Sequence, residues 1–175
     1  MSRELPVRKN IRLKEYDYSS AGYYFVTMCV KGRHEMLGKI VGDAPLRVPH
    51  CELSEYGIFV NEQIQKIDRI YPHVLVDKYV IMPNHVHMIT VVQNRTSVAE
   101  DGTRRGASPT KATVPQIIQS LKSMTTKQSG FNMWQRSYHD HIIRDEIEYQ
   151  RIWQYIDENP QKWMEDDHYV RPTAH

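Results

Sequence analysis

Two adjacent β-prone runs constrain the fold of this chain most strongly. Residues 73–81 and 85–92 are rich in branched and aromatic side chains, and the turn-forming triplet Met82-Pro83-Asn84 separates them. A connection this short predicts that the two runs pair as neighbouring antiparallel strands. The second run opens with His85 and His87, whose side chains share one face because strand residues alternate in direction.

The histidine pair by itself admits two interpretations. Two imidazoles on one strand face are well placed to hold one metal ion, with Val86 packing on the opposite side. Two partly buried imidazoles that are satisfied by hydrogen bonds would give the same pattern. Residues further along the chain are needed to decide between a metal site and a structural pair.

The other elements follow from apolar spacing and from capping residues. Ser54, Thr113 and Asp145 are expected to begin helices, with capping-box partners three residues after the last two, and Asn159-Pro160 is expected to end the third helix. The expected elements are an interior strand at 23–30, a loose hairpin on the sheet edge at 36–51, helices at 54–71, 113–130 and 145–159, and a short strand with an extended segment at 133–144. This order predicts an α+β sandwich, one sheet covered by helices.

Length and charge limit the organisation and the partners. A chain of 175 residues suits a single core, so residues 1–175 are expected to form one domain with a basic arm at 1–18 and a flexible loop at 94–112. The net charge of +2 is far from that of a protein that coats nucleic acid, so any site for a polyanion must be local.

The same inventory bears on localisation. The two cysteines have neither zinc-knuckle spacing nor the density of a disulfide scaffold, which favours a cytoplasmic protein. No apolar run reaches the roughly 18 residues of a membrane span, and no apolar signal region follows the charged amino terminus, so no membrane partner is expected.

The last helix carries two polar side chains off its apolar stripe. Tyr149, Ile152, Trp153 and Ile156 recur at helical spacing and are expected to pack on the sheet. Tyr155 lies roughly 110° from the centre of that stripe at about 100° per residue, and Asn159 lies one turn further along the same edge. Helix geometry alone favours a structural explanation, in which Tyr155 is a half-packed boundary residue and Asn159 ends the helix before proline.

Three segments together resemble a known family. They are Met82-Pro83-Asn84-His85-Val86-His87, the segment from Trp134 to Arg144 that reads Trp-Gln-Arg-Ser-Tyr-His-Asp-His-Ile-Ile-Arg, and Tyr155-Ile156-Asp157-Glu158-Asn159-Pro160. In this order and spacing they resemble the single-tyrosine HUH transposases, especially the REP-associated tyrosine transposases. The resemblance extends over about residues 16–163, and the insertion at 94–112 is a local departure from it.

The resemblance implies both a fold and a chemistry. It implies a ferredoxin-like sandwich of the HUH endonuclease type, in which His85, His87 and Asn159 bind a divalent metal, Mg²⁺ or Mn²⁺, and Tyr155 is the nucleophile. It further implies nicking and rejoining of single-stranded DNA beside a hairpin through a 5′-phosphotyrosine intermediate, by a monomer or a homodimer. The alternative is a non-catalytic DNA- or RNA-binding domain on the same scaffold, in which Tyr155 is structural.

Contacts to DNA are predicted from charge and aromatic character. The expected contacts to the DNA backbone are basic residues of the arm and of the second helix, and the expected base-stacking groups are aromatic residues of segment 133–138. The candidates are Arg8, Lys9, Arg12, Lys122, Lys127, Trp134, Arg136 and Tyr138. The alternatives are that the arm is simply solvated and that Trp134 and Tyr138 belong to the core.

Two other histidine-based classes do not fit. A histidine-triad hydrolase requires a third histidine at position 89, where this chain has Ile89. A cupin would be all-β with a glutamate soon after the pair, whereas residues 88–94 contain no acid and several helices are expected.

Overall fold

A four-stranded antiparallel sheet forms the centre of the computed structural model, which describes residues 20–42, 48–93 and 112–170. Its strands lie in the order β4 (Val74–Ile81), β5 (His85–Val92), β1 (Gly22–Cys29) and β6 (His139–Ile143). With α1 (Glu55–Ile64) between β1 and β4, and α3 (Val114–Ser129) between β5 and β6, this is the βαββαβ connectivity of the ferredoxin-like fold. The predicted α+β sandwich is therefore confirmed.

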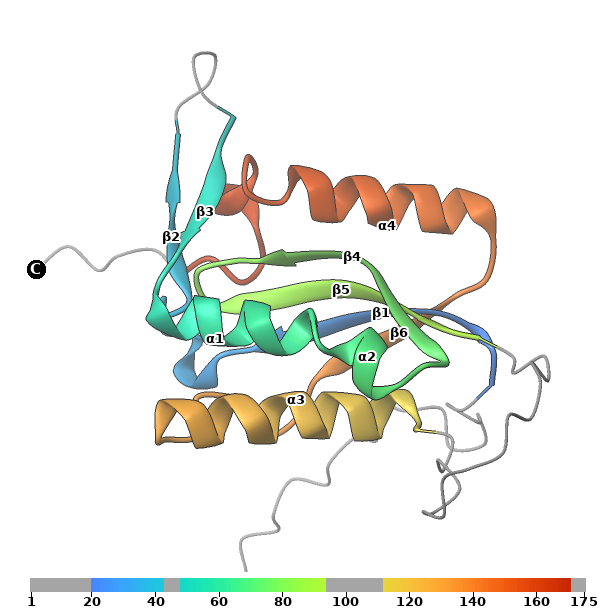
Figure 1. Cartoon of the computed structure of the whole chain (residues 1–175). Helices are drawn as coiled ribbons and strands as arrows, with labels where there is room; N and C mark the ends of the chain where they lie inside the picture. Colours follow the sequence, from blue (N-terminus) through green and yellow to red (C-terminus); the bar gives the residue numbers. More distant parts are fainter. Residues whose placement is uncertain (1–19, 43–47, 94–111, 171–175) are drawn as a thin grey trace, which may run out of the picture.

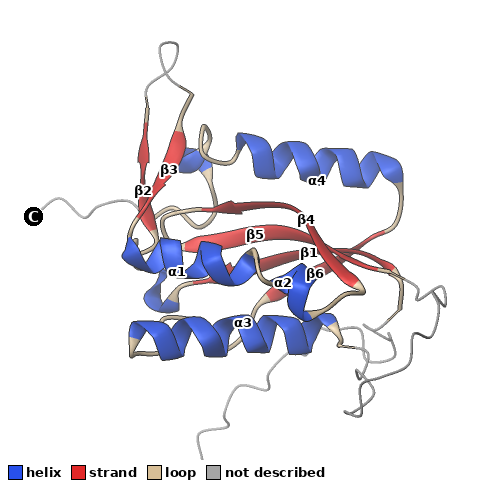
Figure 2. Ribbon diagram, viewed as in Figure 1, coloured by secondary structure: helices blue, strands red, loops and turns tan. Residues whose placement is uncertain are grey.

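The helices lie on both faces of the sheet. Figure 1 shows α1, the short α2 (Ile67–Ile70) and α3 together on one face, and α4 (Glu146–Glu158) alone on the other. The colouring by secondary structure in Figure 2 makes the same helix, sheet and helix layers visible. Helix α4 packs mainly over β4 and β5, so it covers chiefly the β4–β5 half of its face of the sheet.

The strands divide their side chains between these two faces. On β1, Tyr24, Val26 and Met28 point towards α1 and α3 and are completely buried. Their neighbours Tyr23, Phe25 and Thr27 point towards the face that carries α4, because side chains alternate along a strand. The apolar core thus lies mainly between the sheet and the helices α1 and α3, and the face that carries α4 has the aromatic and polar residues.

The predicted strand pair and helix caps are confirmed. β4 and β5 pair antiparallel, and β1 is an interior strand. The Ser54 side chain accepts from the Gly57 amide, Thr113 and Gln116 form the capping box of α3, and the Asp145 side chain accepts from the Glu148 amide. Gly130 ends α3 with a φ of 81°, a left-handed conformation that glycine adopts without strain.

The predicted edge hairpin forms a separate sheet instead. β2 (Gly38–Val41) and β3 (His50–Leu53) pair only with each other, as a two-stranded sheet beside the main one. The hairpin is anchored at its base, where the Leu37 amide donates to the Pro83 carbonyl and the Leu37 carbonyl accepts from the Ser54 amide. These hydrogen bonds hold the β2–β3 hairpin against the β4–β5 turn rather than along an edge of the four-stranded sheet.

The helix expected at 54–71 is broken. α1 ends with Gln65 as its C-cap, and α2 begins after Lys66, whose φ of −91° and ψ of −9° depart from regular helix. The new direction places Ile67 in the core and leaves Ile70 exposed. Packing has therefore overridden a continuous apolar repeat.

Two further differences lie in the last third of the chain. The ordered strand is β6, while Trp134 makes only an isolated bridge to Val30. Trp153 was expected to pack on the sheet with Tyr149, Ile152 and Ile156, but it is 36% exposed. It lies beside edge strand β4, where the Lys78 ammonium sits 3.8 Å from the ring centroid.

Some expectations fall outside the described residues. The basic arm at 1–18, with Arg8, Lys9 and Arg12, and nearly all of the expected loop at 94–112 lie there; Ala112 is described and is buried. Within the described part of the chain, no helix has the length and apolarity that crossing a membrane requires.

Candidate active site

The paired histidines open β5 on the face that carries α4. His85 lies opposite Cys29 and His87 opposite Thr27 on β1, and both imidazoles are at most 1% exposed. Their ring centroids are 4.4 Å apart. The strand spacing that the sequence suggested therefore brings both rings to one buried point of the sheet.

One nitrogen of each imidazole ring contacts a neighbouring side chain, and this contact sets the direction in which the second nitrogen points. The Oδ1 of Asn84 accepts from His85 Nδ1 at 2.9 Å, and Thr27 Oγ1 lies 2.8 Å from His87 Nδ1. Such bonds at Nδ1 fix the ring orientation and leave Nε2 for a ligand. The His85 Nε2 atom is buried and has no hydrogen-bond partner among the described residues.

Both imidazoles are neutral at physiological pH. Burial, and then the nearby His168, lower the pKa of His85 to about 3. Burial, followed by the neighbouring His85, likewise holds the pKa of His87 well below its ordinary value. The neutral ring, with a free lone pair, is the form that binds a metal ion.

Helix α4 brings the predicted tyrosine and asparagine to these rings. The Tyr155 hydroxyl lies 3.1 Å from His87 Nε2, and the side chain is 41% exposed. Asn159, one turn later, is 2% exposed, and its Oδ1 is buried with no partner among the described residues. The structure thus gathers His85, His87, Tyr155 and Asn159 at one place, as the sequence predicted.

Two residues of the site were not predicted. After α4 the chain makes a short 3₁₀ turn, η2 (Trp163–Glu165), and returns Asp166 and His168 to the histidines. One ligand atom from each of His85, His87, Asp166 and His168 lies within 4.8 Å of the others. The return is fixed by the Asn84 side-chain amide, which donates to the His168 carbonyl at 2.8 Å.

Asp166 is the hub of the polar contacts. Its Oδ2 accepts from the Tyr155 hydroxyl at 3.1 Å and from Asn159 Nδ2 at 2.9 Å, and its Oδ1 accepts from the His168 ring at 2.9 Å. Burial alone would raise the pKa of Asp166, but the hydrogen bonds from His168 and Asn159 outweigh it and hold the pKa well below its usual range. The hydrogen bond to this carboxylate raises the pKa of His168 to about 9.

The nucleophile candidate is a phenol rather than a phenoxide in this arrangement. Burial raises the pKa of Tyr155, and the negative charge of Asp166 raises it further. Attack by this oxygen therefore needs both an acceptor for the proton and a positive charge beside the phenoxide.

The donor set fits a divalent cation. Two buried atoms, Asn159 Oδ1 and His85 Nε2, have no hydrogen-bond partner in the described part of the chain. An unsatisfied buried polar atom is costly unless a ligand completes it. With His87 and the Asp166 carboxylate beside them, these atoms are a mixed nitrogen and oxygen set of the kind that holds divalent metals.

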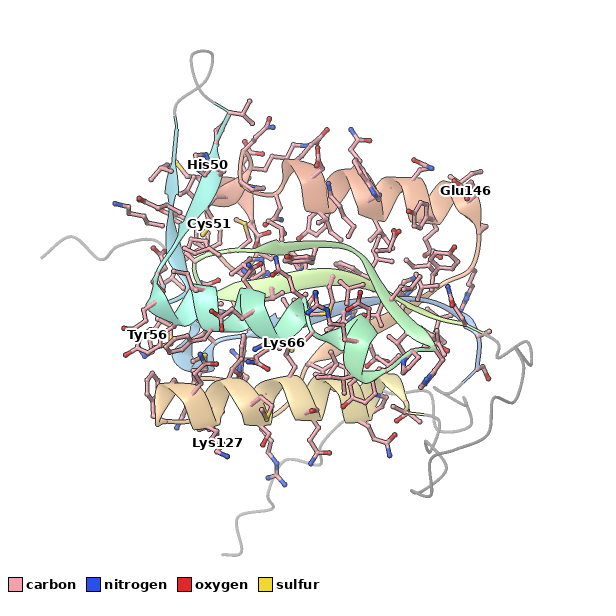
Figure 3. The ribbon with its side chains drawn as sticks, viewed as in Figure 1. His50, Cys51, Tyr56, Lys66, Lys127 and Glu146 are labelled. Atoms are coloured by element: carbon pink, nitrogen blue, oxygen red, sulfur yellow. The ribbon has the colours of Figure 1, made fainter. Side chains whose placement is uncertain are left out.

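The predicted DNA-contacting residues of α3 are not part of this site. Lys122 and Lys127 belong to α3, on the opposite face of the sheet, and Figure 3 shows Lys127 on the outer side of that helix. Lys122 donates to the carbonyls of Gln135 and Ser137, so it braces the following segment. Arg136 is exposed on that segment.

The two aromatic candidates differ from the stacking role expected of them. The Trp134 ring is only 2% exposed and its indole N–H donates to Thr125 Oγ1 at 2.7 Å, so stacking on a base is wrong for this residue and the core interpretation holds. Tyr138 is half-buried and packs against the main core.

Comparisons with known proteins agree with this geometry. The chain is 34% identical over 174 residues to an uncharacterized protein of Haemophilus influenzae, and the match covers 93% of each chain. No family model matches it. The solved structure of a REP-associated tyrosine transposase bound to a REP hairpin superposes with a TM-score of 0.60 and 22% identity, over 86% of this chain and 74% of that one. A candidate transposase of Deinococcus radiodurans matches 84% of this chain and 95% of its own with a TM-score of 0.45 and 18% identity.

The chain belongs to one family with the Haemophilus influenzae protein, and its fold is that of the REP-associated tyrosine transposase.

Proposed function

We propose that this protein is a metal-dependent endonuclease and transposase that nicks and rejoins single-stranded DNA beside a hairpin, with Tyr155 as the nucleophile. The observation that carries the proposal is the position of the Tyr155 hydroxyl, which lies 3.1 Å from both His87 Nε2 and Asp166 Oδ2. A structural tyrosine has no need of buried imidazoles and a carboxylate at its oxygen, whereas a nucleophile does.

The proton of the phenol has a defined acceptor. Asp166 Oδ2 already accepts from the Tyr155 hydroxyl, so the proton leaves along this hydrogen bond, through Asp166 to water, as the phenol oxygen attacks the phosphorus. The new bond joins that oxygen to the 5′ phosphate, and the bond from phosphorus to the 3′ oxygen breaks. The 3′ oxygen takes up a proton from water and leaves as a free hydroxyl.

The covalent product explains how strands are rejoined. The phosphotyrosine bond replaces a phosphodiester of similar energy, so a 3′ hydroxyl of another strand is able to attack it and release Tyr155 without a nucleotide cofactor. As the tyrosine oxygen leaves, it takes back a proton through Asp166, and the attacking 3′ hydroxyl gives its proton to water.

His85, His87 and Asn159 are the proposed ligands of a divalent ion, Mg²⁺ or Mn²⁺, with Asp166 as a further donor. When bound, the ion would neutralise phosphate charge and favour the phenoxide form of Tyr155. The imidazole-rich set favours Mn²⁺ of the two, because Mg²⁺ prefers oxygen ligands. The His168 ring contacts Asp166 Oδ1 at 2.9 Å, so we assign it to pairing with that carboxylate rather than to metal binding.

The substrate class rests on the relative rather than on this chain alone. The solved relative is bound to a REP hairpin. The exposed edge of Tyr155 is compatible with an unpaired strand reaching the site, because attack on one strand requires that the scissile step be unpaired. We therefore propose hairpin DNA with a single-stranded flank as the substrate.

The test is formation of a covalent adduct. Labelled single-stranded DNA that carries hairpins from the flanks of the protein's own gene is incubated with the protein in Mn²⁺ or in EDTA, and then denatured. We expect a denaturation-resistant adduct in Mn²⁺ only, absent from Tyr155→Phe. Tyr79→Phe is the matched control, because it removes a tyrosine hydroxyl that donates to Asn61 of α1 instead of contacting the site.

Each outcome has a meaning. An adduct that persists in Tyr155→Phe would overturn the nucleophile assignment. Binding of the hairpin without any adduct would favour the non-catalytic binding domain.

A further inference from the structure

A second cavity lies on the face of the sheet that carries the active site. It has a volume of about 340 Å³ and is enclosed by Tyr23 from β1, Ile143 from the end of β6, the α4 residues Glu146 and Tyr149, and the connecting residues Arg144 and Asp145. Pockets of this size hold small organic groups. None of these residues takes part in the proposed strand transfer.

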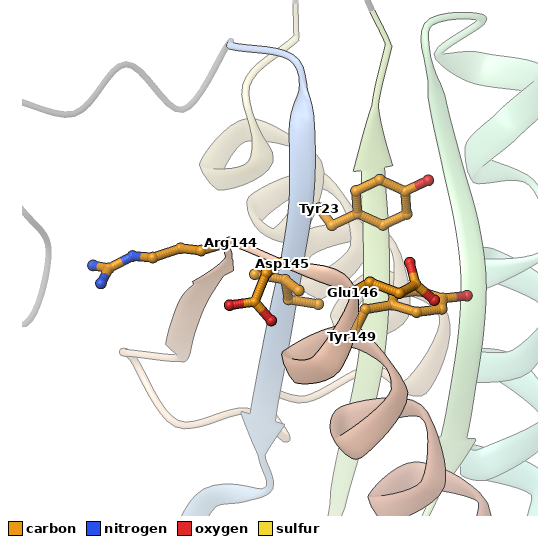
Figure 4. A pocket seen from close by; sticks show the side chains of 6 residues that line it. Tyr23, Arg144, Asp145, Glu146 and Tyr149 are labelled. Carbon is orange, nitrogen blue, oxygen red and sulfur yellow. The ribbon is translucent and has the colours of Figure 1, made fainter.

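Two tyrosine rings form its wall. The Tyr23 and Tyr149 centroids are 5.4 Å apart with an angle of 74° between the planes, so the two rings meet edge to face. Tyr23 is 43% exposed. Figure 4 shows the two rings together, with the Arg144 side chain extending away from them. An accessible aromatic face of this kind is a stacking platform for a planar group.

The charged side chains that line the cavity determine which kind of planar group fits it. Asp145 caps α4 with its side chain and Glu146 lies in the first turn, so carboxylates already neutralise this helix end and disfavour a phosphate in the cavity. A carboxylate has about four lone-pair positions, so each is able to accept further hydrogen bonds. A neutral heterocycle with an amino group matches this lining, because carboxylates accept from base amino groups.

The cavity lies on the same face of β1 as the active site. Tyr23, Phe25 and Thr27 share one face of β1, and Thr27 contacts His87 while the Phe25 ring lies 6.1 Å from that of Tyr155. Four residues of strand span about 13 Å. At about 3.4 Å per stacked nucleotide, and more in an extended strand, this corresponds to roughly two to four nucleotides.

We propose that the cavity between Tyr23 and Tyr149 receives one unpaired nucleobase with an exocyclic amino group, roughly two to four nucleotides from the scissile phosphate. The base stacks on Tyr23 and donates to Glu146, while Arg144 lies outside for the sugar-phosphate backbone. The cavity would then fix the register of cleavage. This inference rests on the proposed function, since it takes DNA as the ligand.

The experiment scans for the base that couples to Tyr23. The probe is the hairpin oligonucleotide from the flank of the gene with its single-stranded extension, carrying one abasic position at a time. Its affinity is measured by fluorescence anisotropy in EDTA, for the wild type and for Tyr23→Leu. The matched control is Phe131→Leu, because Phe131 is 40% exposed and meets Tyr56 edge-on at 5.4 Å, but lies just after α3 on the other face.

We expect one position at which loss of the base weakens wild-type binding about tenfold, the range of base-to-aromatic stacking. Tyr23→Leu should weaken binding of the intact probe by a similar factor and should be insensitive to base loss at that position, as coupled partners are. Phe131→Leu should bind like the wild type.

A second variant keeps the inference testable if Tyr23→Leu fails to fold. Glu146→Gln changes an exposed side chain and should reduce the preference for an amino-bearing base over thymine at the coupled position. The inference is overturned if Tyr23→Leu binds every probe as the wild type does, or if its effect is equal on all abasic probes. If the adduct forms normally in that case, only the cavity assignment fails; if no hairpin binds at all, the proposed function fails with it.

Discussion

The two faces of the central sheet are built from the same strands but differ in composition. On the face towards α1 and α3, Tyr24, Val26 and Met88 are completely buried in a continuous apolar core. On the face towards α4, the intervening positions place His87 in a small polar and aromatic site with Tyr155. Because side chains alternate along a strand, adjacent residues lie on opposite faces of the sheet. The residues on one face stabilise the fold, and those on the other form the candidate site.

The sharpest test of this separation compares neighbours on β5. Met88→Ala should lower the free energy of unfolding by about 2–5 kcal/mol, because it leaves a cavity in the core. His87→Gln should abolish the adduct and cost less stability, because it retains a polar side chain of similar size beside Thr27. Urea unfolding and the adduct assay measure both. Loss of the adduct in Met88→Ala while that variant is still folded would break the separation of the two faces.

Metal binding should stabilise the protein only through the face that carries α4. At 100 times its dissociation constant a ligand adds about 2.7 kcal/mol, which for a chain of this length raises the Tm by about 5–10 °C. Differential scanning fluorimetry in Mn²⁺ and in EDTA should show this shift for the wild type and for Met124→Ala, an exposed position on α3. Asn159→Ala should shift much less; an equal shift would exclude Asn159 from the site.

The start of α4 should respond to acid. The Arg144 amide, and then the His141 ring, donate hydrogen bonds that lower the pKa of Glu148. A carboxylate with a lowered folded pKa contributes stability above its unfolded pKa and loses it as the pH falls through the folded value. Glu148→Gln should therefore be less stable than the wild type near pH 7, and the difference should shrink below about pH 4. A difference that is constant with pH would contradict this origin.

The smallest effect is expected at the outer edge of α4. The Lys78 side chain is 23% exposed; it pairs with the more exposed Asp157 and lies over the Trp153 ring. Exposed ion pairs and cation–π contacts each contribute about 1 kcal/mol or less. Lys78→Met should change the unfolding free energy by about this amount and leave the adduct intact. A larger loss would mean that this edge helps to position α4 over the site.

Local patterns determined most of the fold. Strand alternation placed His85 and His87 on one face, the short turn paired β4 with β5, and the caps at Ser54, Thr113 and Asp145 set the starts of the helices. These features depend on residues within a few positions of each other, so the sequence contains them directly. Helical spacing likewise put Tyr155 and Asn159 on one edge of α4.

Only the tertiary structure decided how the site is completed. Asp166 and His168 follow no periodic pattern, and their signal in the sequence is just an acidic run at 165–167 followed by a histidine. They reach the histidines because the chain turns back after α4 and Asn84 holds the His168 carbonyl. The sequence pattern predicts Trp153 on the buried stripe of the last helix and Trp134 as a base contact, and the structure places the first at the surface and the second in the core. Both differences have one reason: burial depends on how helices and strands pack on one another, and no single segment specifies that.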